Sequence, residues 1–146
     1  MNKIVLITGA TSGIGLGCAR KFAENGDKVI LTGRNGGRLE EIRKELTEKG
    51  AQVLTLVFDV RDRAEATRCI NALPAEWREI DVLVNNAGLA LGVEPEYEGC
   101  CDDWDVMIDT NIKGLLTMTR LIVPGMIERN RGHVINVGSV AGDAAY

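Results

Sequence analysis

Strand-length apolar runs alternate with segments of helical periodicity along this chain, and this alternation constrains its fold more than any other feature. The apolar runs lie at Lys3–Thr8, Lys28–Thr32, Gln52–Val60, Asp81–Val84 and His133–Val137. They are continuous rather than alternating in polarity, which is typical of parallel strands that are covered on both faces. The pattern therefore predicts an α/β domain built on a parallel sheet.

Between these runs the apolar residues recur at helical spacing. One helix is predicted over Arg38–Lys49, and Gly50 is expected to end it. A longer helix is predicted for residues 102–128, with Asn111 inside its apolar stripe and a kink at Pro124. Right-handed crossovers then predict one Rossmann-like, doubly wound domain over residues 1–146, with strand order 3-2-1-4-5. The predicted sheet is truncated after its fifth strand.

Composition excludes several classes of protein. The 146 residues carry 17 Lys and Arg against 21 Asp and Glu, a net charge of −4, and the basic residues are scattered, so a nucleic-acid surface is not expected. The sequence has no apolar run long enough for a membrane helix and no signal-peptide pattern, which predicts a cytoplasmic protein. Its cysteines lack zinc-binding spacing and are interpreted as reduced thiols: Cys18, Cys69, Cys100 and Cys101.

A glycine-rich loop follows the first apolar run and opens a helix. It comprises Gly9, Ala10, Thr11, Ser12, Gly13, Ile14 and Gly15. Backbone N–H groups of such a loop, together with the positive end of the helix, bind a pyrophosphate. The spacing G-x-x-x-G-x-G differs from G-x-G-x-x-G, and the absence of G-K-[ST] disfavours a P-loop nucleotidase. A tight turn with no ligand is the alternative.

The second apolar run ends in Thr32-Gly33-Arg34-Asn35. Dinucleotide folds that select NAD place a carboxylate near this point to bind the ribose 2′-hydroxyl, whereas an arginine accommodates a 2′-phosphate. No carboxylate is present here, and Arg34 could pair with a phosphate. The sequence therefore favours NADP, with a solvated arginine as the alternative.

Polar residues also follow the later strands. Asp59, followed by Val60, could accept a hydrogen bond from an adenine amino group or could cap a helix, and both interpretations stay open. The run 85–88, which includes Asn86, is a polar turn. Ser139 lacks the G-x-S-x-G context and a nearby base, because His133 lies too far back along its strand. It is interpreted as a hydrogen-bond donor to a substrate oxygen or as a simple turn residue.

These motifs, taken in order, resemble the short-chain dehydrogenase/reductase family over the whole chain: Thr8-Gly9-x-x-x-Gly13-Ile14-Gly15, Asp59-Val60, Asn85-Asn86-Ala87-Gly88, Asn111 and Ser139. Residues 85–92 and 103–114 look most like its NADP-dependent 3-hydroxy acid (serine) dehydrogenase branch. The resemblance implies reversible hydride transfer between the nicotinamide of NADP and a small hydroxy acid or other alcohol. It also implies that full-length relatives are homo-oligomers.

The resemblance implies a role for each matching residue. Ser139 would steady the substrate oxygen, and Asn111 would hold a proton-relay water. The loop Gly9–Gly15 would hold the pyrophosphate. The 2′-phosphate, the adenine and its ribose would be met, respectively, by Arg34 with Asn35, by Asp59 with Val60, and by Asn86.

The chain departs from the family at its end. The family's Tyr-x-x-x-Lys would lie beyond Tyr146, so Tyr146 is not assigned as the catalytic acid or base. We therefore expect residues 1–146 to be the N-terminal part of a longer enzyme and to be inactive alone. The alternatives are a non-catalytic NADP-binding module or interaction subunit and, disfavoured by Arg34, a methyltransferase.

Overall fold

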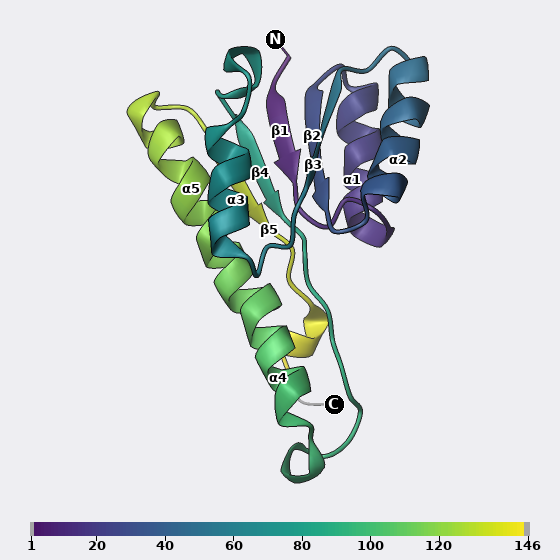
Figure 1. Cartoon of the computed structure of the whole chain (residues 1–146), viewed down its shortest axis with the longest axis vertical. Coiled ribbons are helices and arrows are strands. Elements are labelled where there is room, and N and C mark those ends of the chain that lie inside the picture. Colours follow the sequence, from purple (N-terminus) through teal and green to yellow (C-terminus); the bar gives the residue numbers. More distant parts are fainter. Residues whose placement is uncertain (1, 145–146) are drawn as a thin grey trace.

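The computed structural model describes residues 2–144, so Tyr146 lies outside the described residues. Within them five parallel strands form one sheet of order β3-β2-β1-β4-β5 (Figure 1). The strands are β1 (Ile4–Ile7), β2 (Lys28–Gly33), β3 (Val53–Val57), β4 (Val82–Asn85) and β5 (His133–Asn136). The predicted fold class and strand order are confirmed.

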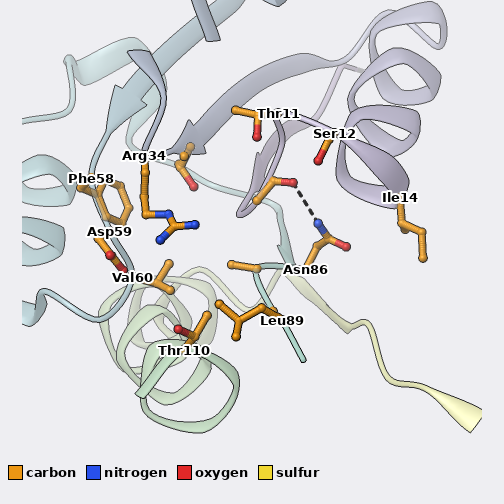
Figure 2. Close-up of a pocket in the computed structure, with 15 residues that line it drawn as sticks. Thr11, Ser12, Ile14, Arg34, Phe58, Asp59, Val60, Asn86, Leu89 and Thr110 are labelled. Atoms are coloured by element: carbon orange, nitrogen blue, oxygen red, sulfur yellow. Dashed lines mark hydrogen bonds between the residues drawn. The ribbon is translucent and has the colours of Figure 1, made fainter. Parts of the chain in front are cut away.

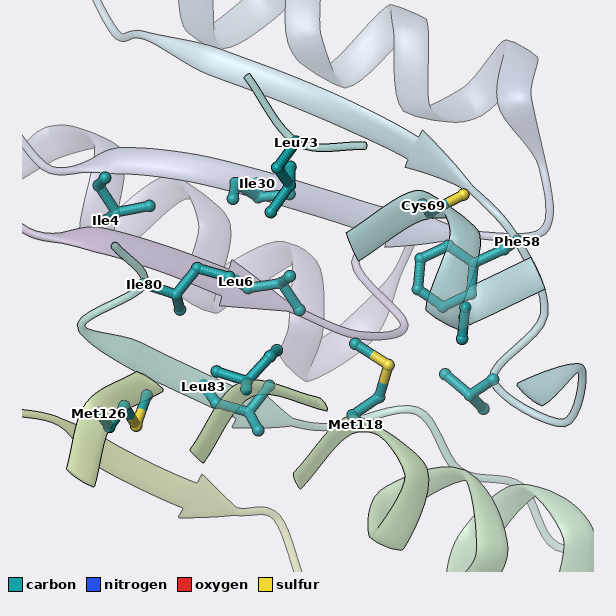
Figure 3. Packing of buried hydrophobic residues seen from close by; sticks show 13 residues of the cluster. Ile4, Leu6, Ile30, Phe58, Cys69, Leu73, Ile80, Leu83, Met118 and Met126 are labelled. Carbon is teal, nitrogen blue, oxygen red and sulfur yellow. The ribbon is translucent and has the colours of Figure 1, made fainter. Parts of the chain in front are cut away.

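Helices cover both faces of this sheet. The first pair, α1 (Gly13–Glu24) and α2 (Gly36–Glu48), lies on one face, and α3 (Arg63–Asn71) lies with α5 (Leu115–Glu128) on the other (Figure 1). The side chains of β1 point alternately toward the helices on the two faces of the sheet. Ile4 and Leu6 pack with the α3 and α5 side chains (Figure 3), and Val5 and Ile7 pack with those of α1 and α2.

The prediction that every strand is buried on both faces is wrong for the two edge strands. β1, β2 and β4 are largely buried, whereas β3 and β5 are mostly half-buried and Val57 is 50% exposed. An edge strand has one neighbour, and the helices reach it only in part.

Every strand ends at a residue other than the predicted one: β1, β2 and β5 differ from prediction by one residue, and the ends of β3 and β4 bear on the site. β3 ends at Val57 rather than Val60, because the chain leaves the sheet once the Phe58 amide has donated to the Gly33 carbonyl at 3.1 Å. β4 runs one residue further than predicted and includes Asn85, whose Nδ2 donates to the Asn136 Oδ1 of β5 at 3.0 Å.

The long helix predicted for residues 102–128 is interrupted. It consists of α4 (Cys101–Ile108), a π-helical segment (Asp109–Gly114) and α5. The irregular geometry lies in the π-helical segment, whereas α5 continues through Pro124. A Cβ at Gly114 would lie 2.6 Å from Val60 Cγ2, so this glycine lets the segment approach the chain just after β3 closely.

The α4 end of the long helix extends beyond the sheet (Figure 1). The apolar stripe predicted for it is therefore buried only at Met118 and Ile122, while Trp104 and Ile108 are exposed. Among residues 2–144 no helix is long and apolar enough to cross a membrane.

Helix ends follow local capping rules. α2 begins at Gly36 rather than Arg38, because Asn35 Oδ1 accepts the Arg38 amide at 3.0 Å and caps the helix. Gly50 has a φ of +94° and ends α2 as predicted. Short 3₁₀ turns lie at Ala75–Trp77, Glu96–Glu98 and Val140–Gly142, and the four cysteines are free thiols.

Candidate functional site

A cavity of about 350 Å³ opens at the carboxyl ends of the first four strands (Figure 2). Of the residues predicted for a cofactor it brings together Gly9, Thr11, Ser12, Ile14, Arg34, Asp59, Val60 and Asn86. The lining further includes residues to which the sequence analysis assigned no individual role: Thr32, Gly33, Phe58, Ala87, Gly88, Leu89 and Thr110. The predicted residues that do not line it are Ala10, Gly13, Gly15, Asn35, Asn111 and Ser139.

Two glycines shape the loop at the mouth of this cavity. Gly9 has a φ of +63°, and a Cβ there would lie 2.9 Å from the Ala87 Cα. A Cβ at Gly15 would lie 2.1 Å from the Gly9 carbonyl oxygen and 2.4 Å from Asn86 Nδ2. Glycine therefore lets α1 begin directly against the loop and the Asn86 turn.

The N-terminus of α1 carries no cap. Ser12 stands at the N-cap without a side-chain hydrogen bond, and the first turn holds no acidic residue. The amides of the first turn have no intrahelical partners, and the helix dipole adds positive charge there. In contrast, Asn35 caps α2 and Asp62 caps α3. The amides at the N-terminus of α1 are thus available to bind an anion in this cavity.

A buried threonine fixes the turn after β4. The Thr8 hydroxyl accepts the amides of Asn86 at 3.0 Å and Ala87 at 2.9 Å. Asn86 Nδ2 in turn donates to the Thr8 carbonyl at 3.2 Å and to the Gly9 carbonyl at 3.0 Å, and Figure 2 marks the second of these bonds with a dashed line. The Oδ1 atom of Asn86 is therefore the part of its amide left for a ligand. Sequence reasoning gave Thr8 no role, although a polar residue closing an apolar strand was the available signal.

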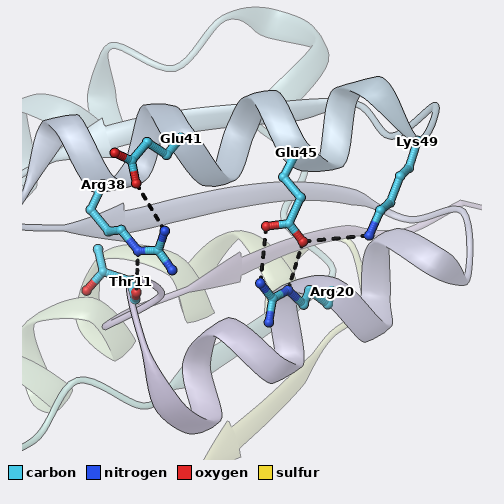
Figure 4. Close-up of polar contacts among 6 residues, drawn as sticks. All are labelled: Thr11, Arg20, Arg38, Glu41, Glu45 and Lys49. Atoms are coloured by element: carbon cyan, nitrogen blue, oxygen red, sulfur yellow. Dashed lines mark hydrogen bonds and ion pairs between the residues drawn. The ribbon is translucent and has the colours of Figure 1, made fainter.

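Arg38 ties the glycine loop to α2. Its Nε donates to the Thr11 carbonyl at 3.3 Å, and its Nη1 pairs with Glu41 at 3.1 Å (Figure 4). Further along the same two helices, Arg20 pairs with Glu45 at 2.9 Å. Such exposed ion pairs contribute about 0–1 kcal/mol each, so Arg38 matters more for the position of the loop than for stability.

Arg34 follows β2 and points into the cavity (Figure 2). It has no ion-pair partner in the part of the chain that the structure describes. A second opening of about 560 Å³ is lined by Thr11, Arg34, Asn35 and Gly36, and the first turn of α2 holds no acidic residue. This end of the site is therefore positively charged.

Asp59 lies across the cavity from the glycine loop. Its carboxylate accepts from the amide of Arg61 at 2.9 Å and from the guanidinium at 2.8 Å, and it caps no helix, since Asp62 caps α3. The capping alternative is therefore wrong for Asp59. Burial alone would raise the pKa of Asp59, but the hydrogen bonds and charge of Arg61 hold it below its ordinary value, so it is ionised at neutral pH.

Asn111 belongs to the π-helical segment, is exposed and does not line the cavity. Its Oδ1 accepts the Leu89 amide at 2.9 Å, and its Nδ2 donates to the Leu89 carbonyl at 2.8 Å. The preceding residue, Thr110, lines the cavity itself. One turn of helix thus contacts both the cavity and the loop after β4, which is a common use of π-helical turns.

Ser139 follows β5 and is exposed. Its Oγ accepts the Ala141 amide at 3.1 Å and caps the short turn Val140–Gly142. An oxygen that already accepts one hydrogen bond keeps its own O–H to donate. The structure therefore leaves Ser139 able to act as a donor, outside the cavity formed by the loop and Arg34.

Comparison with known proteins agrees with this fold. The sequence pattern described as short chain dehydrogenase matches residues 3–146. This chain belongs to that family of proteins. The order of the chain's motifs had already indicated this membership.

Individual relatives are similar over almost the whole chain. The NADP-dependent 3-hydroxy acid dehydrogenase YdfG of Salmonella typhi is 58% identical over 143 residues, which is 98% of this chain and 56% of that protein. The protein of the same name from Escherichia coli (strain K12) is 53% identical with the same coverage. A solved structure of the closed form of serine dehydrogenase complexed with NADP+ matches with a TM-score of 0.94 at 53% identity, over 98% of this chain and 56% of that one. The chain spans about half the length of the curated relatives it matches.

Proposed function

We propose that this chain is the NADP-binding part of an oxidoreductase that transfers a hydride between nicotinamide and a small hydroxy acid or other alcohol. One observation carries the proposal: a single cavity joins the uncapped start of α1 to Arg34, at a strand end that has no carboxylate. The names of the relatives, NADP-dependent 3-hydroxy acid dehydrogenase and serine dehydrogenase, support the same cofactor and substrate class.

The residues present fit the phosphates of NADP. The loop Gly9–Gly15 would bind the pyrophosphate through the amides at the start of α1, which no side chain caps. Arg34 would bind the 2′-phosphate as a charged hydrogen-bond donor. The Oδ1 of Asn35 accepts the Arg38 amide in the cap of α2, so its Nδ2 would be the atom that donates to a phosphate oxygen.

The remaining predicted residues fit the adenosine half. Asp59 is held as an ionised acceptor, which suits the amino group of adenine, and Val60 supplies an apolar surface beside it. Asn86 keeps its Oδ1 for a ribose hydroxyl, because its Nδ2 is bonded to the glycine loop.

When bound, NADP supplies the nicotinamide carbon that exchanges a hydride with the substrate. Ser139 would donate its O–H to the substrate oxygen, since its Oγ already accepts the Ala141 amide. Asn111 would hold a proton-relay water, since its Nδ2 and Oδ1 each make one bond to Leu89 and each keep one further hydrogen-bonding position. The sequence contains no Tyr-x-x-x-Lys, so proton exchange with the alcohol is assigned to no residue of this chain.

Assembly and location are part of the same proposal. Apolar side chains exposed on the long helix support a homo-oligomer, with Ile108 at 45%, Ile112 at 54% and Leu116 at 58% exposure. Free cysteines support a reducing, cytoplasmic location.

Calorimetric titration of the purified protein with NADP and with NAD tests the cofactor. We expect NADP to bind at least about tenfold more tightly, because each hydrogen bond to a charged group contributes about 1.5–3 kcal/mol. Equal affinity, or tighter binding of NAD, would contradict the proposal.

Asn35 allows the two functions of one side chain to be separated. Asn35→Asp keeps the cap of α2, so the free energy of unfolding should stay within about 0.5 kcal/mol of the original. The added carboxylate repels the 2′-phosphate, and NADP affinity should fall about tenfold while NAD affinity is unchanged. Urea denaturation and calorimetry measure the two effects. Asn35→Ser, a neutral cap, is the control, and an equal loss for both cofactors would count against a phosphate contact.

A further inference from the structure

The cavity is lined by two charged side chains of opposite sign, Arg34 and Asp59. They follow neighbouring strands, since Gly33 of β2 pairs with Val57 of β3. The charge of Arg34 is itself one of the influences that lower the pKa of Asp59, after burial and the contacts of Arg61 are counted. Asp59 is therefore placed to compete with a phosphate for Arg34.

A third residue removes this competition. Arg61 surrounds the Asp59 carboxylate: its amide reaches Oδ1 at 2.9 Å, its Nε reaches Oδ2 at 3.0 Å, and its Nη2 reaches Oδ2 at 2.8 Å. Bidentate contacts of this kind fix orientation as well as charge. Arg34, in contrast, forms no ion pair within residues 2–144.

We propose that Arg61 is a positioning residue that sets the preference for NADP over NAD. By engaging Asp59 it leaves Arg34 available for the 2′-phosphate, and it cancels the negative charge that would otherwise repel that phosphate. This inference rests on the proposed function, because it takes Arg34 as the partner of a 2′-phosphate.

The other charges near this group do not replace Arg61. Asp109 of the π-helical segment acts on Arg61, but it is itself paired with Lys113 at 3.0 Å. Arg63, at the start of α3, forms no ion pair with Asp59 among the described residues, whereas Arg61 does. Without Arg61, Asp59 would have Arg34 as its nearest partner in the cavity.

The test is the ratio of NADP affinity to NAD affinity, measured by calorimetry at pH 7.5 and low salt. Both cofactors carry the same adenine, so the ratio cancels any change in adenine binding by Asp59. Arg61→Met should lower NADP affinity about five- to tenfold and leave NAD within about twofold, as expected for one uncompensated charge near the surface. Arg61→Lys, which keeps the charge but loses the bidentate contact, should give a smaller loss.

The double variant Asp59→Asn/Arg61→Met should restore the original ratio, because the competing carboxylate is gone. Arg63→Met removes an equal charge nearby and should leave the ratio unchanged. Circular dichroism confirms that each variant is folded, and Arg61→Gln replaces the methionine variant if that one is not.

Equal losses for both cofactors, an unchanged ratio, or no recovery in the double variant would overturn the inference. These outcomes are distinct from failure of the proposed function, in which the unaltered protein itself shows no preference for NADP. Raising the salt concentration should shrink the effect of Arg61→Met, since screening weakens all of the charges involved.

Discussion

Replacing Gly15 with alanine is expected to abolish measurable NADP binding and to lower the free energy of unfolding by about 2–3 kcal/mol. The added Cβ would lie 2.1 Å from the Gly9 carbonyl oxygen and 2.4 Å from Asn86 Nδ2. The first of these atoms is backbone, so the loop itself has to move. The amides at the start of α1 would then lose the arrangement on which the proposed phosphate contacts depend. Urea denaturation and calorimetry measure the two losses.

Gly17 provides a matched control in the same helix. Nothing lies within 4 Å of a Cβ built there, and the residue is exposed. Gly17→Ala should therefore raise the free energy of unfolding by about 0.5–1 kcal/mol, the ordinary gain of alanine over glycine within a helix, and leave NADP binding intact. If both variants behaved alike, the close approach at Gly15 would not be the cause.

Reversing the charge of Arg34 is expected to change cofactor selection more than any other single substitution. Arg34→Asp removes the proposed donor to the 2′-phosphate and places a carboxylate where NAD-selective folds have one. NADP affinity should fall on the order of 100-fold, and NAD affinity should stay the same or rise. Parallel calorimetric titrations with the two cofactors measure the change.

Lys44→Glu is the control for this experiment, because it alters net charge equally on an exposed position of α2. It should leave both affinities unchanged. A similar loss of NADP binding in both variants would show a general effect of net charge, and an unchanged preference in Arg34→Asp would remove Arg34 from the site.

The sheet was predictable because its signal is local. Each buried strand, such as β1 with Ile4–Ile7, is a continuous apolar run. Because crossover connections are right-handed, five such strands can be arranged in a sheet in only a few orders. The glycine loop and Arg34 were found for a similar reason, since both directly follow a strand. Strand ends at Val57 and Asn85 were missed because they depend on neighbours in the sheet.

The contacts that complete the site were not predictable from local pattern. Thr8 meets Asn86 across a separation of 78 residues, and Arg38 meets Thr11 across 27. Asp59 and Arg61 are close in sequence, yet nothing in their order indicates that the arginine turns back onto the carboxylate. The π-helical segment left one trace, the polar Asn111 within an apolar stripe, which finds its partners on Leu89.

That π-helical segment also divides the long helix into two halves, α4 and α5. One additional residue per turn offsets the rotational phase of everything that precedes it by about 100°, the angle one residue occupies in an α-helix. This offset adds to the position of α4 beyond the sheet: Met118 and Ile122 of α5 pack in the core, while Trp104 and Ile108 of α4 remain exposed. Sequence changes in α4 can therefore alter the outer surface of the protein without repacking its core.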